Sequence, residues 1–221
     1  MNSWDEIFLR GRFTSEYPQA EVAKFVSFAE KRFNEKELKF WDHCCGAGRH
    51  TLMLASRGHR VYASDGSKVS LEILQNRLKE RGLRAEVKDA DMCECPWNED
   101  FHVVISWDAI HHNTIANIRK AVDVIHSHLI PGGMFIATLK SNKADNFGLG
   151  KCIENNTYVI PEGVEKGIVH HYFDEEEIKS LFSRWKILLL VEQVSRNVII
   201  EPAFVEEHIF PSTKWGIIAQ K

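Results

Sequence analysis

Hydrophobic and polar positions form two kinds of segment that alternate along most of the chain. Short apolar runs typical of buried strands are separated by stretches in which apolar residues recur every three or four positions, as on one helix face. The expected helices are one that ends near Gly58, one over 69–78, one over 115–129 and one that begins at Asp174. This alternation predicts an α/β fold with parallel strands. The expected strands cover residues 38–42, 61–63, 85–87, 103–105, 134–139, 185–194 and 214–219.

Two regions depart from this rhythm. We expect residues 1–36 to form a helical arm, because apolar residues share one helical face there, and residues 37–221 to form one domain. Residues 141–172 carry Asn, Gly, Pro and mixed apolar residues without a clear period. Such long stretches are usually lids or binding elements, so we expect an insertion on the substrate side. The arm carries aromatic residues that could form a lid, although ordinary packing explains them nearly as well: Trp4, Phe8, Phe13 and Tyr17.

Composition and charge exclude several classes of protein. The chain has 221 residues, of which 44% are hydrophobic and 27% charged, and these globular values exclude a disordered, collagenous or coiled-coil protein. With 28 basic and 31 acidic residues the net charge is −3, so we expect no nucleic-acid partner. No apolar run approaches the ~20 residues of a membrane helix. The acidic start lacks a signal-peptide pattern and the five cysteines are odd in number, so we expect a cytoplasmic protein with reduced thiols. Nothing in the sequence indicates an oligomeric state.

A glycine-rich segment lies where the first expected strand meets the following helix. Gly46 and Gly48 allow a tight turn and a close approach of the backbone. The start of the next helix offers free N–H groups to an anionic group. Asp65 follows Gly48 at about the ~20-residue distance at which an acid at the end of the second strand reaches ribose hydroxyls. Together these features predict a nucleoside cofactor at the carboxyl edge of the sheet.

The same segment distinguishes between nucleoside cofactors. A dinucleotide site needs a third glycine in the pattern G-x-G-x-x-G, and Thr51 stands at that position. Asp42 would be unfavourable beside a pyrophosphate but favourable beside an ammonium or a sulfonium. The lysine-containing pattern of ATP and GTP hydrolases is absent. These residues favour a cofactor with an amino-acid tail, a cationic sulfur and an adenosine.

On these motifs the sequence resembles the class I S-adenosylmethionine-dependent methyltransferases, in the broad small-molecule group with the tellurite-resistance and ubiquinone-pathway enzymes. The resemblance covers residues 38–139 well and the C-terminal half more loosely. It implies a Rossmann-like, doubly wound and mostly parallel seven-stranded sheet with an antiparallel C-terminal hairpin. It also implies S-adenosyl-L-methionine as the cofactor. The cofactor-binding residues that it implies are Asp42, Cys44, Gly46, Gly48, Asp65, Gly66, Asp91, Met92, Ser106 and Trp107.

The sequence departs from the family at two positions and identifies no firm catalytic residue. Cys44 stands where the family has glycine, and His102 where it has an acid. Holding nucleophile, methyl and sulfur in line could supply about 7–11 kcal/mol, whereas a general base adds roughly 10²–10⁴-fold in rate. A base is therefore optional, and His111, His112 and His171 are the candidates. For His111 and His112, packing or a helix start is the competing interpretation.

No metal is expected, because the pair Cys93 and Cys95 falls short of a zinc pattern.

The primary hypothesis is methylation of a small molecule by in-line displacement. One alternative is methylation of tRNA or of a protein side chain. Another is a non-catalytic cofactor-binding module, which Cys44 and His102 keep open. Acidic residues lie beside the basic residues on which the tRNA alternative depends. These basic residues, in and near the arm, are Lys24, Lys31, Arg32, Lys36 and Lys39.

Overall fold

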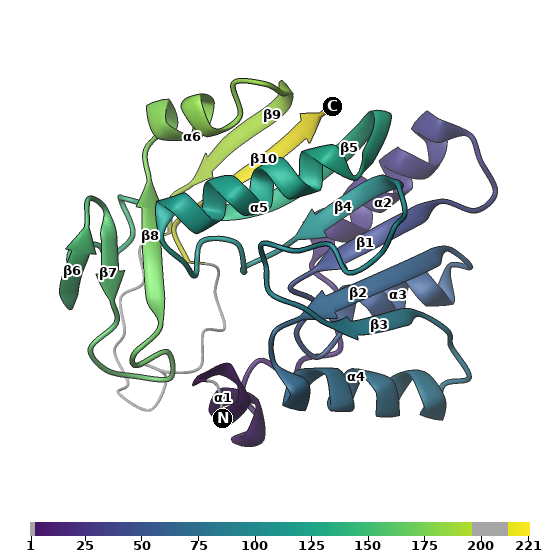
Figure 1. Ribbon diagram of the computed structural model, residues 1–221, viewed down its shortest axis with the longest axis horizontal. Coiled ribbons are helices and arrows are strands. Elements are labelled where there is room, and N and C mark those ends of the chain that lie inside the picture. Colours follow the sequence, from purple (N-terminus) through teal and green to yellow (C-terminus); the bar gives the residue numbers. More distant parts are fainter. Residues whose placement is uncertain (1–2, 196–211) are drawn as a thin grey trace.

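The computed structural model describes residues 3–195 and 212–221, and one twisted sheet runs through the centre of the protein (Figure 1). Five strands pair in parallel in the order β3-β2-β1-β4-β5. Beyond β5 the sheet continues antiparallel through β10 (Lys214–Gln220) to β9 (Lys186–Gln193). The predicted mostly parallel sheet with an antiparallel C-terminal part is confirmed, but the described residues form ten strands instead of the expected seven, because three further strands, β8, β7 and β6, join the sheet at the end of β5. The parallel strands are β1 (Lys39–His43), β2 (Arg60–Asp65), β3 (Glu86–Asp89), β4 (Phe101–Ser106) and β5 (Leu129–Ser141).

Helices cover both faces of this sheet, because successive apolar side chains of a strand point to opposite sides. On β4, Val104 packs into the core shared with α5, and Val103 and Ile105 pack into the core shared with α2. Figure 1 shows α5 in front of the sheet and α2 behind it. Among the described helices, none has the length and apolar character of a membrane span. The helices on this core are α2 (Ala20–Phe33), α3 (Arg49–Ser56), α4 (Lys68–Glu80), α5 (Ile115–Ser127) and α6 (Glu175–Leu181).

Side-chain caps fix where several of these helices begin. Ser67 accepts a hydrogen bond from the Ser70 N–H at the start of α4, and Thr114 accepts one from Asn117 at the start of α5. Asp174 accepts one from the Glu177 N–H and begins α6, as predicted. Each cap satisfies a backbone donor that the first helical turn leaves unpaired.

Two sequence-based expectations need correction. The helix expected over 115–129 ends at Ser127, and the following strand begins at Leu129 instead of 134 because Leu129 already pairs with Phe101. Residues 141–172 are not without regular structure. They contain β6 (Lys151–Glu154), β7 (Thr157–Val159) and most of β8 (Val169–Phe173), which pair as an antiparallel ribbon. The four residues from His170 of β8 are all buried, so its sequence lacks the alternation that reveals a half-buried strand.

The first 36 residues divide into two parts. Helix α2 is packed into the core, with Val22 and Val26 fully buried. Helix α1 (Ser3–Leu9) lies near the start of α4, at the edge of the sheet where the parallel strands end (Figure 1). The β6–β8 ribbon joins the same edge, because β8 pairs with the last two residues of β5.

Candidate cofactor and acceptor site

Gly48 determines the shape of the loop after β1. Gly48 begins α3 with φ of 84°, in the left-handed region that favours glycine. A Cβ at this position would lie 2.2 Å from Leu74 Cδ1 of α4. The absence of a side chain therefore lets α4 press against the loop. Arg77 of α4 also holds the loop, since its guanidinium donates to the Ala47 carbonyl at 2.9 Å.

Asp42 lies beneath this loop. Its side chain is 2% exposed and accepts a hydrogen bond of 2.6 Å from the Thr51 hydroxyl of α3. Burial raises the pKa of Asp42 to about 6, although hydrogen bonds from Thr51 and the charge of Arg49 oppose the shift. The carboxyl thus ties α3 to the end of β1. Its direct contact with a cofactor stays a prediction.

Asp65 joins the first loop to the second. Its two carboxylate oxygens accept hydrogen bonds of 2.8 Å from the N–H groups of Gly46 and Ser67, and Gly66 lies within this turn. Burial raises the pKa of Asp65, and the two N–H donors oppose that shift. Each carboxylate oxygen has a second lone pair that can accept a hydroxyl hydrogen bond. The two N–H donors therefore fix the orientation of the Asp65 carboxyl group, whose contact with a ribose stays a prediction.

His43 connects the third and fourth loops, a role that the sequence did not reveal. Its Nε2 lies 2.8 Å from the Met92 carbonyl after β3, and its Nδ1 lies 3.1 Å from the Ser106 hydroxyl at the end of β4. Burial lowers the pKa of His43 to about 4, so the ring is neutral at pH 7. A neutral ring donates from Nε2 to the carbonyl and accepts at Nδ1 from the hydroxyl. Asp91, which precedes Met92, is exposed and accepts from the Cys93 N–H.

The loop after β4 carries a charged network beside Trp107. Asp108 accepts from Lys214 of β10 at 2.8 Å and from Arg49 of α3 at 3.3 Å. Burial alone would raise the pKa of Asp108, but Lys214 and Arg49 outweigh it and the net shift is downward. The Lys214 ammonium also lies 5.3 Å from the centre of the Trp107 ring. This network fixes the loop that faces the predicted acceptor.

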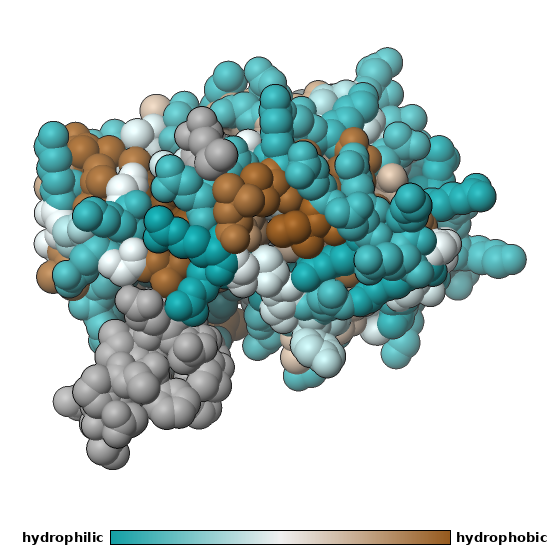
Figure 2. Space-filling model, turned by 90° about the horizontal axis from the view of Figure 1, so that it is seen from below, coloured by the Kyte–Doolittle hydropathy of each residue, from teal (hydrophilic) through white to brown (hydrophobic). Residues whose placement is uncertain are grey.

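Helix α1 crosses three of these loops. The Phe8 ring contacts the loop after β1, because a Cβ at Gly46 would lie 3.3 Å from Phe8 Cζ. Asp5 accepts from the Ser67 hydroxyl at 2.7 Å, and the Trp4 ring lies 4.9 Å from that of His112. Figure 2 views the protein from the side of α1 and α4 and shows apolar side chains among hydrophilic ones. The N-terminal helix therefore covers the edge at which the cofactor is expected.

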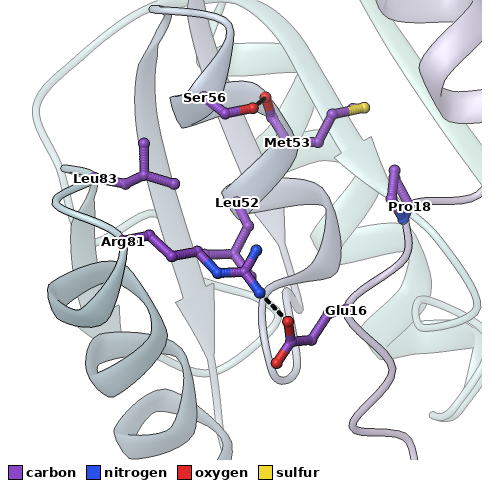
Figure 3. A pocket seen from close by; sticks show the side chains of 7 residues that line it. All are labelled: Glu16, Pro18, Leu52, Met53, Ser56, Arg81 and Leu83. Atoms are coloured by element: carbon purple, nitrogen blue, oxygen red, sulfur yellow. Dashed lines mark hydrogen bonds and ion pairs between the residues drawn. The ribbon is translucent and has the colours of Figure 1, made fainter.

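A separate groove lies between the arm and the outer sides of α3 and α4 (Figure 3). An ion pair between Glu16 and Arg81 crosses it. It contains none of the predicted cofactor-binding residues, so we do not assign the cofactor there. Its lining is Glu16, Pro18, Leu52, Met53, Ser56, Arg81 and Leu83.

The three candidate catalytic histidines have different surroundings. His171 Nδ1 lies 2.6 Å from the Thr157 hydroxyl, and its Nε2 lies 3.2 Å from a Glu177 oxygen without a hydrogen bond between them. The His111 carbonyl accepts from the backbone of β8, and its ring packs 4.2 Å from that of His112. His112 instead faces His170, the neighbour of the candidate His171, and Glu165, which the sequence did not single out as a site residue.

The two departures from the family pattern have structural explanations. Cys44 adopts φ of 56°, the left-handed conformation for which glycine is usual. Such a conformation costs a non-glycine residue about 1–2 kcal/mol. His102 accepts from the Lys39 N–H at 3.0 Å and lies 3.3 Å from Glu35, so it joins the start of β1 to the segment after α2.

Comparison with known proteins agrees with this architecture. Residues 40–133 match a family model described as a methyltransferase domain. An uncharacterised methyltransferase of Synechocystis sp. is 30% identical over 116 residues, 48% of this chain and 53% of that protein, so this chain spans about half its length. A solved SAM-dependent methyltransferase from Methanosarcina mazei has a TM-score of 0.70 at 18% identity, over 86% of this chain and 95% of that one.

A second solved structure extends the comparison. Magnesium protoporphyrin IX methyltransferase from Synechocystis, with bound S-adenosylhomocysteine, has a TM-score of 0.65 at 16% identity. The similarity covers 91% of this chain and 81% of that one. These likenesses confirm the predicted doubly wound fold.

Proposed function

We propose that this protein, whose residues 40–133 match a family model described as a methyltransferase domain, transfers the methyl group of S-adenosylmethionine to a small-molecule acceptor. The observation that carries the proposal is the junction of Asp65 with Gly46. It places an ordered carboxylate at the carboxyl edge of the sheet, beside the glycine-rich turn. In an open α/β sheet this edge is where ligands bind.

The residues present fit such a cofactor. Asp65 would hold the ribose hydroxyls, and the backbone of the Gly46–Gly48 turn would approach the amino-acid tail closely. Asp91 and Met92 would face the adenine. When bound, the cofactor supplies a methyl group on a positively charged sulfur, and its leaving thioether needs no proton.

The protein's own contribution is to position the acceptor and exclude water. Asp108, held by Lys214 and Arg49, fixes the loop after β4. Helix α1 covers the loops, and the Trp4 ring lies against His112 on the acceptor side. Reactant alignment of this kind could supply on the order of 7–11 kcal/mol of the barrier, so a catalytic acid is not required.

Two features support a small acceptor. Helix α1 and the β6–β8 ribbon both flank the acceptor side, since the His112 ring lies 4.9 Å from that of Trp4 and 4.6 Å from that of His170. The net charge of −3 gives no general attraction to a polyanion. We therefore infer that the acceptor enters a covered space instead of docking on an open surface.

Calorimetric titration with S-adenosylhomocysteine tests cofactor binding. We expect the wild type to bind, and we expect Asp65→Ala to bind at least about 10-fold more weakly because it loses charge-assisted bonds to hydroxyls. Asp100→Ala, an exposed acid before β4, is the matched control and should leave binding unchanged. Since Asp65 also orders two loops, a melting curve of each variant separates unfolding from lost binding. Folded wild type that fails to bind at millimolar ligand would overturn the proposal.

A second measurement tests transfer itself. Radiolabelled methyl from S-adenosylmethionine should appear in the low-molecular-mass fraction of a metabolite extract incubated with the protein. Label in tRNA or protein would assign a macromolecular acceptor instead. Repeated absence of product, together with measured binding of S-adenosylhomocysteine, would indicate a non-catalytic module.

A further inference from the structure

Three side chains beside the acceptor side form a compact cluster. His112 follows β4, Glu165 lies in the turn before β8 and His170 is within β8. One ligand atom from each lies within 4.8 Å of the others. Glu165 Oε1 is 3.9 Å from His112 Nε2, and Glu165 Oε2 is 3.4 Å from His170 Nε2.

The histidines of this cluster are buried without the partners that such groups normally have. The His170 side chain is 0% exposed, and neither of its ring nitrogens has a hydrogen-bond partner within the described residues. His112 Nδ1 is also buried and unpaired in the same part of the chain. Buried polar groups are rarely left unpaired, so His170 Nε2, which faces Glu165, points to a missing ligand between the two side chains.

We propose that His112, Glu165 and His170 bind one divalent transition-metal ion of the zinc type. Two imidazoles and one carboxylate are a donor set that zinc uses in sites with three protein ligands and an open fourth position. With bonds of about 2.0–2.2 Å, tetrahedral ligands lie about 3.4 Å apart. The separations of 3.4 and 3.9 Å are close to this value, and the third pair, which lies within 4.8 Å, would have to approach by up to about 1.4 Å to close around an ion.

The charges around the cluster are compatible with a cation. Glu165 supplies the negative charge. Lys140 of β5 also lies near the histidines, and the negative charges of Glu165 and Asp108 counter its positive charge there. The Trp4 ring lies against His112. If the proposed function holds, the open coordination position faces the acceptor and would take an anionic oxygen or sulfur atom from it.

Metal binding can be measured without any methyl acceptor. The full chain, treated with a chelator and dialysed, would be titrated with Zn²⁺ by calorimetry, and Co²⁺ would report ligand geometry through its visible absorption. We expect one ion per chain at micromolar or lower concentration. Glu165→Gln and His170→Ala should each weaken binding at least about 10-fold, as loss of a ligand predicts.

Matched controls distinguish this site from adventitious binding. Glu162→Gln, an exposed acid in the same turn, should bind zinc like the wild type. Cys152→Ser removes an exposed thiol and should also leave binding unchanged. Zinc binding that survives Glu165→Gln and His170→Ala, or that disappears with Cys152→Ser, would overturn the inference, as would folded protein that binds no zinc at millimolar concentration.

The outcome is independent of the cofactor experiment. Binding of S-adenosylhomocysteine without zinc binding would reject the metal site alone. Zinc binding without S-adenosylhomocysteine binding would reject the proposed methyltransferase site alone.

Discussion

The cofactor loops and the acceptor side differ in how their buried polar groups are satisfied. Around the cofactor loops, Asp42, His43 and Asp65 each have hydrogen-bond partners within the protein. On the acceptor side, His112 and His170 keep buried nitrogens without partners in the described residues. The first region is therefore ordered by its own bonds before any ligand arrives. The second region keeps ring nitrogens that a bound ligand could pair.

The contrast extends to charge. Buried carboxyl groups lie in the cofactor loops, where backbone N–H groups and a hydroxyl stabilise them. The acceptor side is dominated by imidazoles, and burial lowers the pKa of His111 and of His112. Neutral imidazoles can accept a proton or ligate a metal, whereas a carboxylate fixed by donors serves mainly to orient a ligand. The difference suggests separate tasks for the two regions.

The largest expected loss of stability tests whether the cofactor loops depend on close packing. Gly48→Ala introduces a Cβ that would lie 2.2 Å from Leu74 Cδ1, in a left-handed conformation. Strain of about 1–3 kcal/mol and overpacking of about 1–3 kcal/mol should together lower the free energy of unfolding by about 4 kcal/mol. Urea unfolding at pH 7 measures this loss.

Gly58→Ala is the matched control for that change. Gly58 has φ of 82°, but a Cβ there meets nothing within 4 Å. Gly58→Ala should therefore lower the free energy of unfolding by the backbone strain alone. Equal losses in the two variants would mean that α4 does not press on the loop.

The next effect uses pH to test the buried acid of the first region. The pKa of Asp42 is raised from 3.8 to about 6, so its stabilising contribution is complete below pH 3.8 and is lost as pH rises through 6. A shift of two pKa units corresponds to about 3 kcal/mol. Asp42→Asn keeps an acceptor for Thr51 without the charge. We expect it to be more stable than the wild type by up to about 3 kcal/mol at pH 7, with the difference vanishing near pH 4.

Urea unfolding of both proteins between pH 4 and pH 8 measures that difference. Thr51→Val is a useful companion, because it removes the hydroxyl donor and should destabilise the protein at pH 7. A stability difference between Asp42→Asn and wild type that is constant across this range would show that Asp42 ionises as in an unfolded chain.

The smallest effect concerns the second region. In the presence of a chelator, His170→Leu replaces two unpaired buried nitrogens with an apolar side chain. We expect the free energy of unfolding to rise by about 1–2 kcal/mol, since an unsatisfied buried polar group costs about 1–3 kcal/mol. Thermal unfolding with and without chelator measures it, with His171→Leu as control. His171 is bonded to Thr157, so its replacement should destabilise the protein. A loss of stability in His170→Leu would mean that its nitrogens already have stabilising partners.

Much of the fold could be predicted because its signals are local. Buried strands read as short apolar runs, and Asp174 and Gly82 mark helix ends through cap chemistry that involves only neighbouring residues. The β6–β8 ribbon could not be predicted, because consecutive burial from His170 onward removes the alternating pattern.

Some residues of the candidate site could likewise be predicted from the sequence, and others could not. Asp65 and the glycines could be identified because the spacing between strand ends brings them to one edge of a parallel sheet. His43 lay inside the recognised segment, but its bonds to Met92 and Ser106 depend on residues far along the chain. Glu165 and His170 have no motif spacing to His112, so nothing local connects them.

The sequence by itself determined the strands and helices of the parallel part of the sheet, the glycine-rich turn and the acid at the end of the second strand. Those features depend on residue types and on short distances along the chain. Only the tertiary structure decided that α1 lies across the loops and that His112, Glu165 and His170 meet. Such contacts join segments that are distant in sequence, and they arise because packing around the sheet brings those segments together, which no local periodicity records.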